Sequence, residues 1–508
     1  MKKFIWVFAF TAIFAISLKA QTNPLLMTTM AVVKDMGLGI NLGNTMESTG
    51  SWIDPTVTAH ETAWGSPVIT GAMISGYASN GFKTVRIPVA WSNLMGNNYT
   101  INAGLLNRVE ELVNYVLNNG MYAIVNIHWD GGWWENFPTD SAECMNRYKR
   151  MWGQISERFK NHSGYLVFES LNEEGVWDDV WNRYNGSGTK VRAYGLLNAI
   201  NKEFTDLIRA SGGNNANRHL LIAGYATDIN LTCDNAFKMP TDPKNRQAVS
   251  VHYYDPFGFT HLKEDESWAT MRLTWGTTQD YTDLSNAMNK LKTTFVDKGI
   301  PVIVGEYGVA APNRPASEIQ KYTLAVAEAI YERNMCPVLW DVQLGDNETQ
   351  YYYNRKANPP SLVDQQLATG FKEITKGYLS SSSSSKPSSS SVALSSSSSK
   401  PSSSSKPSSS SVALSSSSSN PGPVPIAWPV ASHSNALNAM QNAVNLQITA
   451  NANVQIFDLK GNTVRALNFA PGNYFVPLGD LPQGLYIVKA SSGSWNKSIR
   501  VPVTARLI

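Results

Sequence analysis

Two carboxylates are the residues of this chain that are best placed to do chemistry together. Glu173 comes two positions after the apolar run Tyr165-Leu-Val-Phe-Glu-Ser-Leu171, and Glu306 directly follows Pro301-Val-Ile-Val-Gly305. Short apolar runs of this kind are typical of buried strands, so each glutamate is expected at the end of a strand. A pair of carboxylates can supply both the acid and the nucleophile that cleavage of a glycosidic bond requires.

Eight such runs lie between residues 38 and 340, and helix-like stretches fill most of the gaps between them. The runs are Leu38–Leu42, Thr84–Pro88, Tyr122–Ile127, Leu166–Leu171, His219–Ala223, Ala248–Val251, Val302–Gly305 and Cys336–Trp340. The helical stretches are Leu105–Leu117, Tyr148–Phe159, Leu197–Ala210, Leu284–Phe295 and Ile319–Glu332. Strands that are apolar throughout and alternate with helices predict a (β/α)8 TIM barrel with parallel strands.

A doubly wound sheet is the competing fold for this alternation. It predicts a glycine-rich phosphate loop after the first strand, but Gly37-Leu-Gly39 lacks the third glycine of that motif. In a barrel, catalytic groups lie at the carboxyl ends of the strands. Six of the eight runs end in side chains that are capable of chemistry, namely Arg86, His128, Asn172 with Glu173, His252 with Tyr254, Glu306, and Trp340.

The rest of the chain predicts three further parts beside this domain of residues 22–379. Residues 1–20 have a cationic start, a short apolar run and a small residue at the end, which indicates a signal peptide and a secreted or cell-surface protein. An uncleaved membrane anchor is the alternative. Residues 380–425 are rich in serine and proline and predict a flexible linker. Short alternating strands with glycine and proline turns in residues 426–508 predict a small β-sandwich.

Charge and cysteine content exclude several other classes. The net charge of +3 comes without a block of basic residues, which argues against a nucleic-acid partner. Three cysteines allow at most one disulfide, and their spacing matches no metal site. Cys336 lies in an apolar run and is expected in the core. We also expect a monomer with no cofactor and no catalytic metal.

The order of motifs in the first domain resembles glycoside hydrolase family 5, the endoglucanase-type members of a large retaining (β/α)8 clan. The resemblance covers residues 30–345 and is carried by Gly39–Glu47, Glu61–Gly65, Gly81–Pro88, Asn126–Trp129, Leu171–Glu173, His252–Tyr254, Gly305-Glu306 and Trp340-Asp341. It implies an endo-β-1,4-glucanase that acts on a β-glucan. Mixed-linkage glucanase, xyloglucanase, mannanase and an inactive polysaccharide binder remain as alternatives.

The resemblance implies the acid/base role for Glu173 and the nucleophile role for Glu306. It places the other candidates around the substrate: Arg86, His128, Asn172, His252, Tyr254, Trp340 and Trp129. Three departures from the family pattern are Glu174 in place of proline, Trp129 in place of histidine, and Val342 in place of a polar residue. These positions are expected to border the sugar sites, although Glu174 could instead be merely solvated.

Physical expectations follow for the charges of this pair. Arg86 and the Tyr254 hydroxyl should lower the pKa of Glu306, and a negative Glu306 should raise the pKa of Glu173. The Asn172 amide could hydrogen-bond the sugar 2-hydroxyl. Tryptophans stack well on pyranose faces but serve equally in cores. We expect Trp340 and half of a further set to line a long groove: Trp129, Trp133, Trp134, Trp177, Trp181, Trp268 and Trp275.

The C-terminal segment resembles the sorting domains that bacterial secretion machinery recognises. The resemblance rests on Phe457-Asp-Leu-Lys-Gly461 and Leu481–Lys489. A carbohydrate-binding module is the rival interpretation, with Trp428, Tyr474 or Trp495 as its platform.

Overall fold

The computed structural model describes residues 23–343, 351–382, 426–428, 436–440, 443–458, 461–478, 481–482, 484–493 and 495–503. The predicted signal peptide and residues 383–425 of the predicted linker lie outside the described residues. The chain divides into two compact units, which are described separately.

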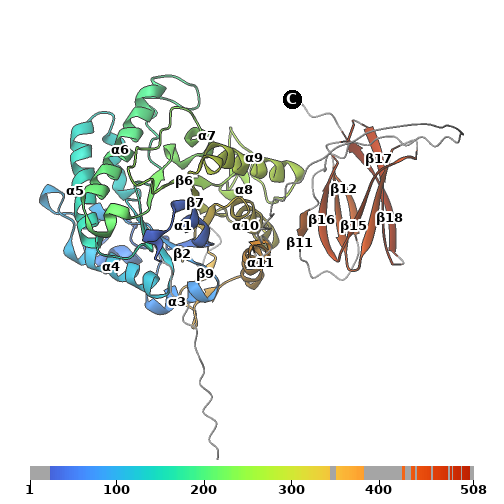
Figure 1. Ribbon diagram of the computed structural model, residues 1–508, viewed down its shortest axis with the longest axis horizontal. Coiled ribbons are helices and arrows are strands. Elements are labelled where there is room, and N and C mark those ends of the chain that lie inside the picture. Colours follow the sequence, from blue (N-terminus) through green and yellow to red (C-terminus); the bar gives the residue numbers. More distant parts are fainter. Residues whose placement is uncertain are drawn as a thin grey trace, which may run out of the picture. The chain divides into compact units, whose positions relative to one another are not determined.

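The first unit contains a closed barrel of eight parallel strands in chain order (Figure 1). The strands are β1 (Gly39–Asn41), β2 (Thr84–Ile87), β3 (Tyr122–Asn126), β4 (Leu166–Glu169), β5 (Leu220–Ala223), β6 (Gln247–Tyr253), β7 (Val302–Tyr307) and β8 (Cys336–Leu339). The barrel closes because β1 pairs with both β2 and β8. All eight predicted strands are present, and the predicted TIM barrel is confirmed.

Helices lie around the strands, and the first of them lies across one end of the barrel (Figure 1). They are α1 (Thr29–Asp35), α2 (Val57–Thr62), α3 (Gly71–Ser79), α4 (Ala103–Asn118), α5 (Ser141–Phe159), α6 (Lys190–Ala210), α7 (Ile229–Thr232), α8 (Phe257–Thr260), α9 (Thr278–Thr294), α10 (Ala316–Tyr331) and α11 (Gln365–Ser382). A two-stranded hairpin, β9 (Tyr353–Asn354) with β10 (Ser361–Leu362), precedes α11. The five predicted helices correspond to α4, α5, α6, α9 and α10.

Helix α4 illustrates how the sequence specifies these helices. The Asn102 side chain caps it by accepting hydrogen bonds from the next turn. Leu105, Val109, Leu112 and Val116 recur on one face and are buried, as an amphipathic helix against a barrel requires.

The end of the barrel interior that lies against α1, here called the floor or the lower end, is lined mainly by apolar side chains. Side chains from six strands form one cluster with Val32, Val33 and Met36, which come from α1 and the residue after it. The strand contributions are Tyr122, Ile124, Val167, Leu221, Ala248, Ile303, Cys336 and Val338. Helix α1 therefore closes this end of the barrel, and the network of buried charged side chains around Arg86 lies toward the other end.

The second unit consists of two four-stranded antiparallel sheets, ordered β11-β16-β13-β12 and β15-β14-β17-β18. The strands are β11 (Ile426–Trp428), β12 (Ala436–Met440), β13 (Ala443–Ile448), β14 (Ala452–Phe457), β15 (Thr463–Phe469), β16 (Gly472–Pro477), β17 (Gly484–Ser492) and β18 (Trp495–Val503). Inward side chains of both sheets share one core. Burial alternates along β14, as the sequence pattern predicted, so the predicted β-sandwich is present.

All three cysteines are free thiols, and Cys336 is buried in β8 as expected. Within the part of the chain that the structure describes, no helix combines the length and the apolarity that a membrane crossing demands.

Candidate active site

The register between β6 and β7 brings two functional side chains together. Val251 pairs with Val304, but His252 pairs with Glu306, so Gly305 is left as an extra residue in β7. Such a bulge re-aims the side chains that follow it. A Cβ on Gly305 would lie 3.2 Å from Ser250 Oγ and 3.3 Å from His252 Nε2, so these two side chains would have to move by a few tenths of an ångström to admit it. The bulge therefore lets His252 and Glu306 face the same space.

Arg86 on β2 is the centre of the polar network inside the barrel. Its guanidinium is fully buried and donates to Glu169 Oε2 at 2.7 Å, Asn41 Oδ1 at 3.1 Å, Asn172 Oδ1 at 2.8 Å and Glu306 Oε1 at 2.9 Å. A guanidinium is a rigid fork of donors, so it fixes all four acceptors relative to one another.

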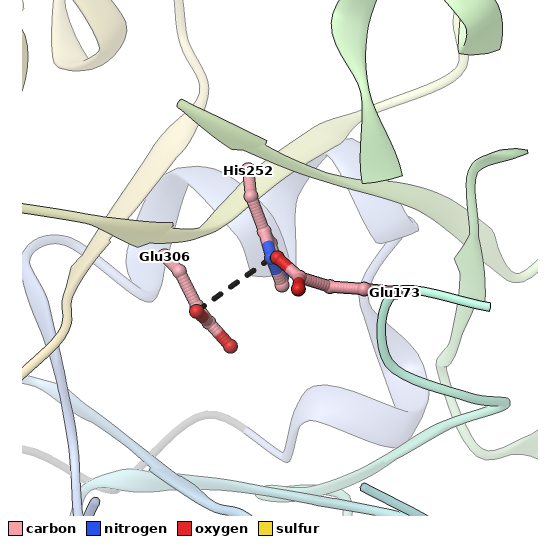
Figure 2. Close-up of side chains that lie close together, drawn as sticks. All are labelled: Glu173, His252 and Glu306. Atoms are coloured by element: carbon pink, nitrogen blue, oxygen red, sulfur yellow. Dashed lines mark hydrogen bonds and ion pairs between the residues drawn. The ribbon is translucent and has the colours of Figure 1, made fainter. Parts of the chain in front are cut away.

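His252 lies close to both candidate carboxylates. Figure 2 shows Glu306 and His252 side by side, with Glu173 reaching toward them from the segment after β4. His252 Nδ1 lies 2.7 Å from Glu173 Oε1 and 3.7 Å from Glu306 Oε2. One carboxylate oxygen of each glutamate and a ring nitrogen of His252 all lie within 4.8 Å of one another. The Glu306 side chain is 8% exposed, but that of Glu173 is 51% exposed.

Tyr254 is a second hydrogen-bond donor to Glu306. Its hydroxyl donates to Glu306 Oε2 at 2.9 Å, while Arg86 binds the other oxygen. Both oxygens of Glu306 are thus positioned by donors that favour the ionised form.

The pKa shifts of the pair run opposite to the expectation from the sequence. Burial raises the pKa of Glu306, and this outweighs the opposing effects of His252, Arg86 and the Tyr254 hydroxyl. For Glu173, loss of hydration is outweighed by the hydrogen bond from His252 and by the charges of His252 and Arg86, so its pKa is lowered. The sequence could not show that His252 contacts Glu173 most closely.

Asn172, His128 and Trp340 line the same mouth. Arg86 has only donors, so the Asn172 oxygen faces it and the Asn172 NH₂ group is left for another acceptor. The His128 ring stacks on Trp340 at a centroid distance of 5.7 Å and an interplanar angle of 8°. Burial, with Arg86 and His252 nearby, holds the pKa of His128 well below its usual value, so the ring is neutral.

Three buried polar residues of this network were missing from the sequence prediction. Asn41 donates to the Gly305 carbonyl at 2.9 Å, and Ser250 Oγ donates to Glu169 Oε1 at 2.7 Å. Glu169 and Asn41 each hold Arg86 from another side. Their signal was visible, because each is a polar residue inside an otherwise apolar run.

The three departures from the family pattern differ in their positions. Glu174 is buried, accepts a hydrogen bond from the Asn172 backbone N–H, and has a pKa well above the usual range, mainly because of burial. It is therefore not merely solvated. Val342 is also buried, but Trp129 is 47% exposed. Only Trp129 of the three presents a large surface.

The tryptophans contribute less to the surface than expected. Trp340 is half-buried, and Trp129 and Trp268 are exposed. The remaining five of the predicted set are buried: Trp133, Trp134, Trp177, Trp181 and Trp275. Trp52, which the sequence prediction omitted, is 68% exposed.

Glu173, His252 and Glu306 also form the group of described residues that could ligate a metal ion. The Arg86 guanidinium lies 2.9 Å from Glu306, and its positive charge opposes a bound cation. The donor set therefore fits a metal poorly.

A cavity of about 440 Å³ lies among the loops that follow β1, β2 and β3. Its polar lining includes His60, Ser92, Asp130 and Arg147, together with Trp133. Of the predicted tryptophan set, Trp133 lines this cavity, and so does Asp130, the residue that follows Trp129.

A (β/α)8 barrel with two carboxylates facing each other at its mouth defines a class of sugar-polymer hydrolases. The family model described as cellulase (glycosyl hydrolase family 5) matches residues 46–346, and the model of the secretion system C-terminal sorting domain matches residues 438–503. The chain belongs to glycosyl hydrolase family 5 and is a glycoside hydrolase of the cellulase type with a C-terminal sorting domain.

Relatives and solved structures agree with this placement. Endoglucanase A of Paenibacillus barcinonensis is 34% identical over 384 residues, which cover 69% of this chain and 92% of that protein. The xyloglucan-specific endo-β-1,4-glucanase of Bacteroides ovatus is 32% identical over 356 residues, covering 66% and 68%. The structure of a broad specificity endoglucanase from an uncultured bovine rumen ciliate aligns with a TM-score of 0.63 at 34% identity, covering 69% and 99%.

Proposed function

We propose that this chain is a retaining endo-β-1,4-glucanase that cleaves cellulose-type β-glucans by double displacement. Glu306 is the nucleophile and Glu173 the acid/base. The observation that carries the proposal is the separation of their carboxylate oxygens, which is within 4.8 Å. Retaining enzymes need about 5 Å between the two carboxyl groups, whereas inverting enzymes need roughly 6.5–9.5 Å to admit a water molecule.

The different surroundings of the two carboxylates support the assignment of roles. Glu306 is buried and held at both oxygens by Arg86 and Tyr254, so it is oriented for attack on the anomeric carbon. Glu173 is half exposed and bound by one strong contact to His252, so it is free to turn toward the glycosidic oxygen. In the first step Glu306 forms the glycosyl bond and Glu173 gives its proton to the leaving oxygen. In the second step Glu173 takes a proton from water, which displaces Glu306.

Substrate binding must reverse the proton distribution of the free site. In the free site the contact with His252 lowers the pKa of Glu173, and burial raises that of Glu306. A sugar between the two carboxylates would draw Glu173 away from His252 Nδ1 and leave it near a negative Glu306. Both changes raise the pKa of Glu173, and the proton then lies where the first step needs it.

Other side chains of the mouth suit a glucosyl residue. The NH₂ group of Asn172 is free to donate to the 2-hydroxyl, an interaction that strengthens in the transition state. Trp340, stacked on neutral His128, presents a flat face for the pyranose ring.

A branched glucan is the second candidate substrate. The polar cavity of about 440 Å³ that Asp130 and Trp133 line has room for a side-chain sugar, and the relative from Bacteroides ovatus is specific for xyloglucan. Activity on soluble cellulose derivatives, mixed-linkage glucan, xyloglucan and mannan would rank these substrates.

The test compares wild type with Glu306→Gln and Glu173→Gln on this panel. Loss of the nucleophile should lower kcat by about 10⁴-fold or more, and loss of the acid/base by about 10²–10⁴-fold. Glu264→Gln is the matched control, because this carboxylate is exposed in the segment after α8. Activity that survives in Glu306→Gln refutes the nucleophile, and a wild type that is inactive on every glucan and mannan favours a polysaccharide binder.

We also propose that the C-terminal sorting domain directs export, so that the enzyme acts outside the cell or at its surface. Trp495 packs partly against the core of the β-sandwich, which argues against its use as a sugar platform. The side chains of Trp428 and Tyr474 lie outside the described ones. Deletion of residues 420–508 should abolish export and leave adsorption to cellulose unchanged. Loss of adsorption would instead support a carbohydrate-binding module.

A further inference from the structure

Glu174, the residue after the proposed acid/base, has a buried carboxyl group that the proposed mechanism does not use. Glu174 is 1% exposed, whereas the side chain of Glu173 is 51% exposed. Two consecutive glutamates thus lie in opposite environments, one in the core and one at the mouth of the barrel. Acidic side chains are rarely buried unless they have a partner, so the contacts of Glu174 bear on its role.

The carboxyl group of Glu174 folds back onto the backbone of the turn that carries Glu173. Its Oε2 accepts the backbone N–H of Asn172, so the side chain closes a short ring across Glu173. The Glu174 carbonyl accepts the N–H of Ala226, in the loop after β5, at 2.8 Å. The turn of residues 172–174 is therefore held at its start by the side chain of Glu174 and at its end by the Glu174 backbone.

The surroundings of this turn are fixed by other groups. Tyr148 of α5 donates to the Ser170 carbonyl at 2.8 Å, and the Asn172 side chain accepts from Arg86 at 2.8 Å. These contacts hold the end of β4 and the Asn172 amide, but they do not hold the Asn172 N–H. Without the Glu174 carboxyl group this donor would lose its acceptor, and the peptide that precedes Glu173 could turn.

Glu174 makes this contact as a neutral acid. Burial, reinforced by the charges of Glu173 and Glu169, raises its pKa well above the usual range. Its Oε1 is buried and has no hydrogen-bond partner among the described residues, which suits a protonated carboxyl group better than a carboxylate. A neutral Glu174 accepts the Asn172 N–H with its carbonyl oxygen and adds no second negative charge beside Glu173.

We propose that Glu174 is a positioning residue, whose carboxyl group fixes the turn of residues 172–174 so that the Glu173 carboxyl group is held in line with the glycosidic oxygen. This inference rests on the proposed function, in which Glu173 is the acid/base. Glu173 is half exposed and contacts His252 through one oxygen, so its direction depends on the backbone beneath it. A proline, which the family pattern has at position 174, would restrict the same turn through its ring.

The experiment compares two substrates that differ in their need for a proton. The sugar that leaves from cellotetraose must be protonated by Glu173, whereas 2,4-dinitrophenyl β-cellobioside releases a stable phenolate without help. For both substrates kcat/KM reports the step that forms the glycosyl–enzyme intermediate. A misplaced acid should therefore cost rate on the first substrate alone, and Glu174→Ala should lower kcat/KM about tenfold on cellotetraose and less than about twofold on the dinitrophenyl glycoside.

Three further variants complete the design in the full-length protein. Glu174→Gln keeps an uncharged acceptor of similar shape and should stay within about twofold of wild type on both substrates. Glu174→Asp is one methylene shorter and should show the same split as Glu174→Ala, so the test also works if the alanine variant does not fold. Glu328→Ala in α10 is the matched control, because burial raises the pKa of this carboxyl group to about 7 as well, and it should leave both substrates unaffected.

Two results would overturn the proposal. Equal losses on both substrates in Glu174→Ala and Glu174→Asp would show that the residue only stabilises the fold, and no loss would show that the turn is held without it. Glu173→Gln is the reference, which should lose about 10²–10⁴-fold on cellotetraose and change little on the dinitrophenyl glycoside. A reference without this split, or a wild type that cleaves neither substrate, would instead refute the proposed function.

Discussion

The two ends of the barrel interior are built from the same strands but from opposite chemistry. At the lower end, Ile124, Val167 and Ile303 pack in an apolar cluster beneath α1. Two positions further along their strands, and so on the same inner face, β3 and β4 place Asn126 and Glu169. Within three residues of β3 and of β4, the inner face of the barrel therefore changes from apolar side chains to polar and charged ones.

This difference shows how the fold separates stability from function. Apolar side chains at the floor need only shape to fit together. At the mouth, fully buried Arg86 has to be matched by Glu169 and Glu306, because an unpaired buried charge is costly. The mouth thus contains a buried charge that is costly in free energy, and the same charge holds Glu306 in position.

The largest expected effect comes from removing Arg86. Arg86→Met leaves Glu169 buried without its cation, which should lower the free energy of unfolding by about 3–5 kcal/mol. Adding Glu169→Gln should restore part of this loss, since it removes the unpaired carboxylate. Chemical denaturation followed by tryptophan fluorescence measures both. A loss below about 1 kcal/mol in the single variant would contradict the costly pairing at the mouth.

Gly305→Ala should damage the mouth without unfolding the barrel. The added Cβ pushes against Ser250 Oγ and His252 Nε2, so His252 moves relative to both carboxylates. A displacement of about 1 Å can cost about 10²-fold in rate, and the shift required here is a few tenths of an ångström, so kcat should fall by roughly 2–10-fold. Gly153→Ala in α5 is the matched control, because its Cβ meets nothing within 4 Å. Unchanged kcat in Gly305→Ala would show that the bulge does not position the pair.

Tyr254→Phe should shift the pH profile. The hydroxyl lowers the pKa of Glu306, so its removal lets Glu306 take up a proton at higher pH. Glu306 must be ionised to attack, so the acid limb of kcat, which reports the enzyme–substrate complex, should move to higher pH while the alkaline limb stays in place. The pH dependence of kcat on a soluble glucan at saturating concentration measures this. A shift of the alkaline limb alone would contradict the assignment and indicate that Glu306 is the acid/base and Glu173 the nucleophile.

The smallest effect is expected at the floor. Ile303→Val removes one buried methylene and should cost about 0.5–1.5 kcal/mol of stability. Both limbs of the pH profile should stay where they are, because the floor cluster contains no group that titrates with the pair. A shifted limb would show that the two ends are coupled.

The strands could be predicted because each is buried on both faces and leaves an apolar run in the sequence. The polar side chains that end these runs were predicted for the same reason, and the structure brings Arg86, Asn172, His252 and Glu306 together. An apolar run does not reveal which of its residues face inward, so Glu169 was passed over. The extra residue at Gly305 leaves no trace in the sequence pattern, and neither does the contact of His252 with Glu173.

Glu306 as the covalent nucleophile is tested most directly by trapping the glycosyl–enzyme intermediate. A 2-deoxy-2-fluoro cellobiosyl fluoride forms a covalent glycosyl–enzyme intermediate with a retaining enzyme. This intermediate is hydrolysed slowly, because the fluorine destabilises the transition state of the second step. Peptide mass spectrometry of the inactivated protein should find one added fluorocellobiosyl group, attached to Glu306. Attachment to Glu173 or Glu169, or an unlabelled enzyme that releases inverted product, would contradict the assignment.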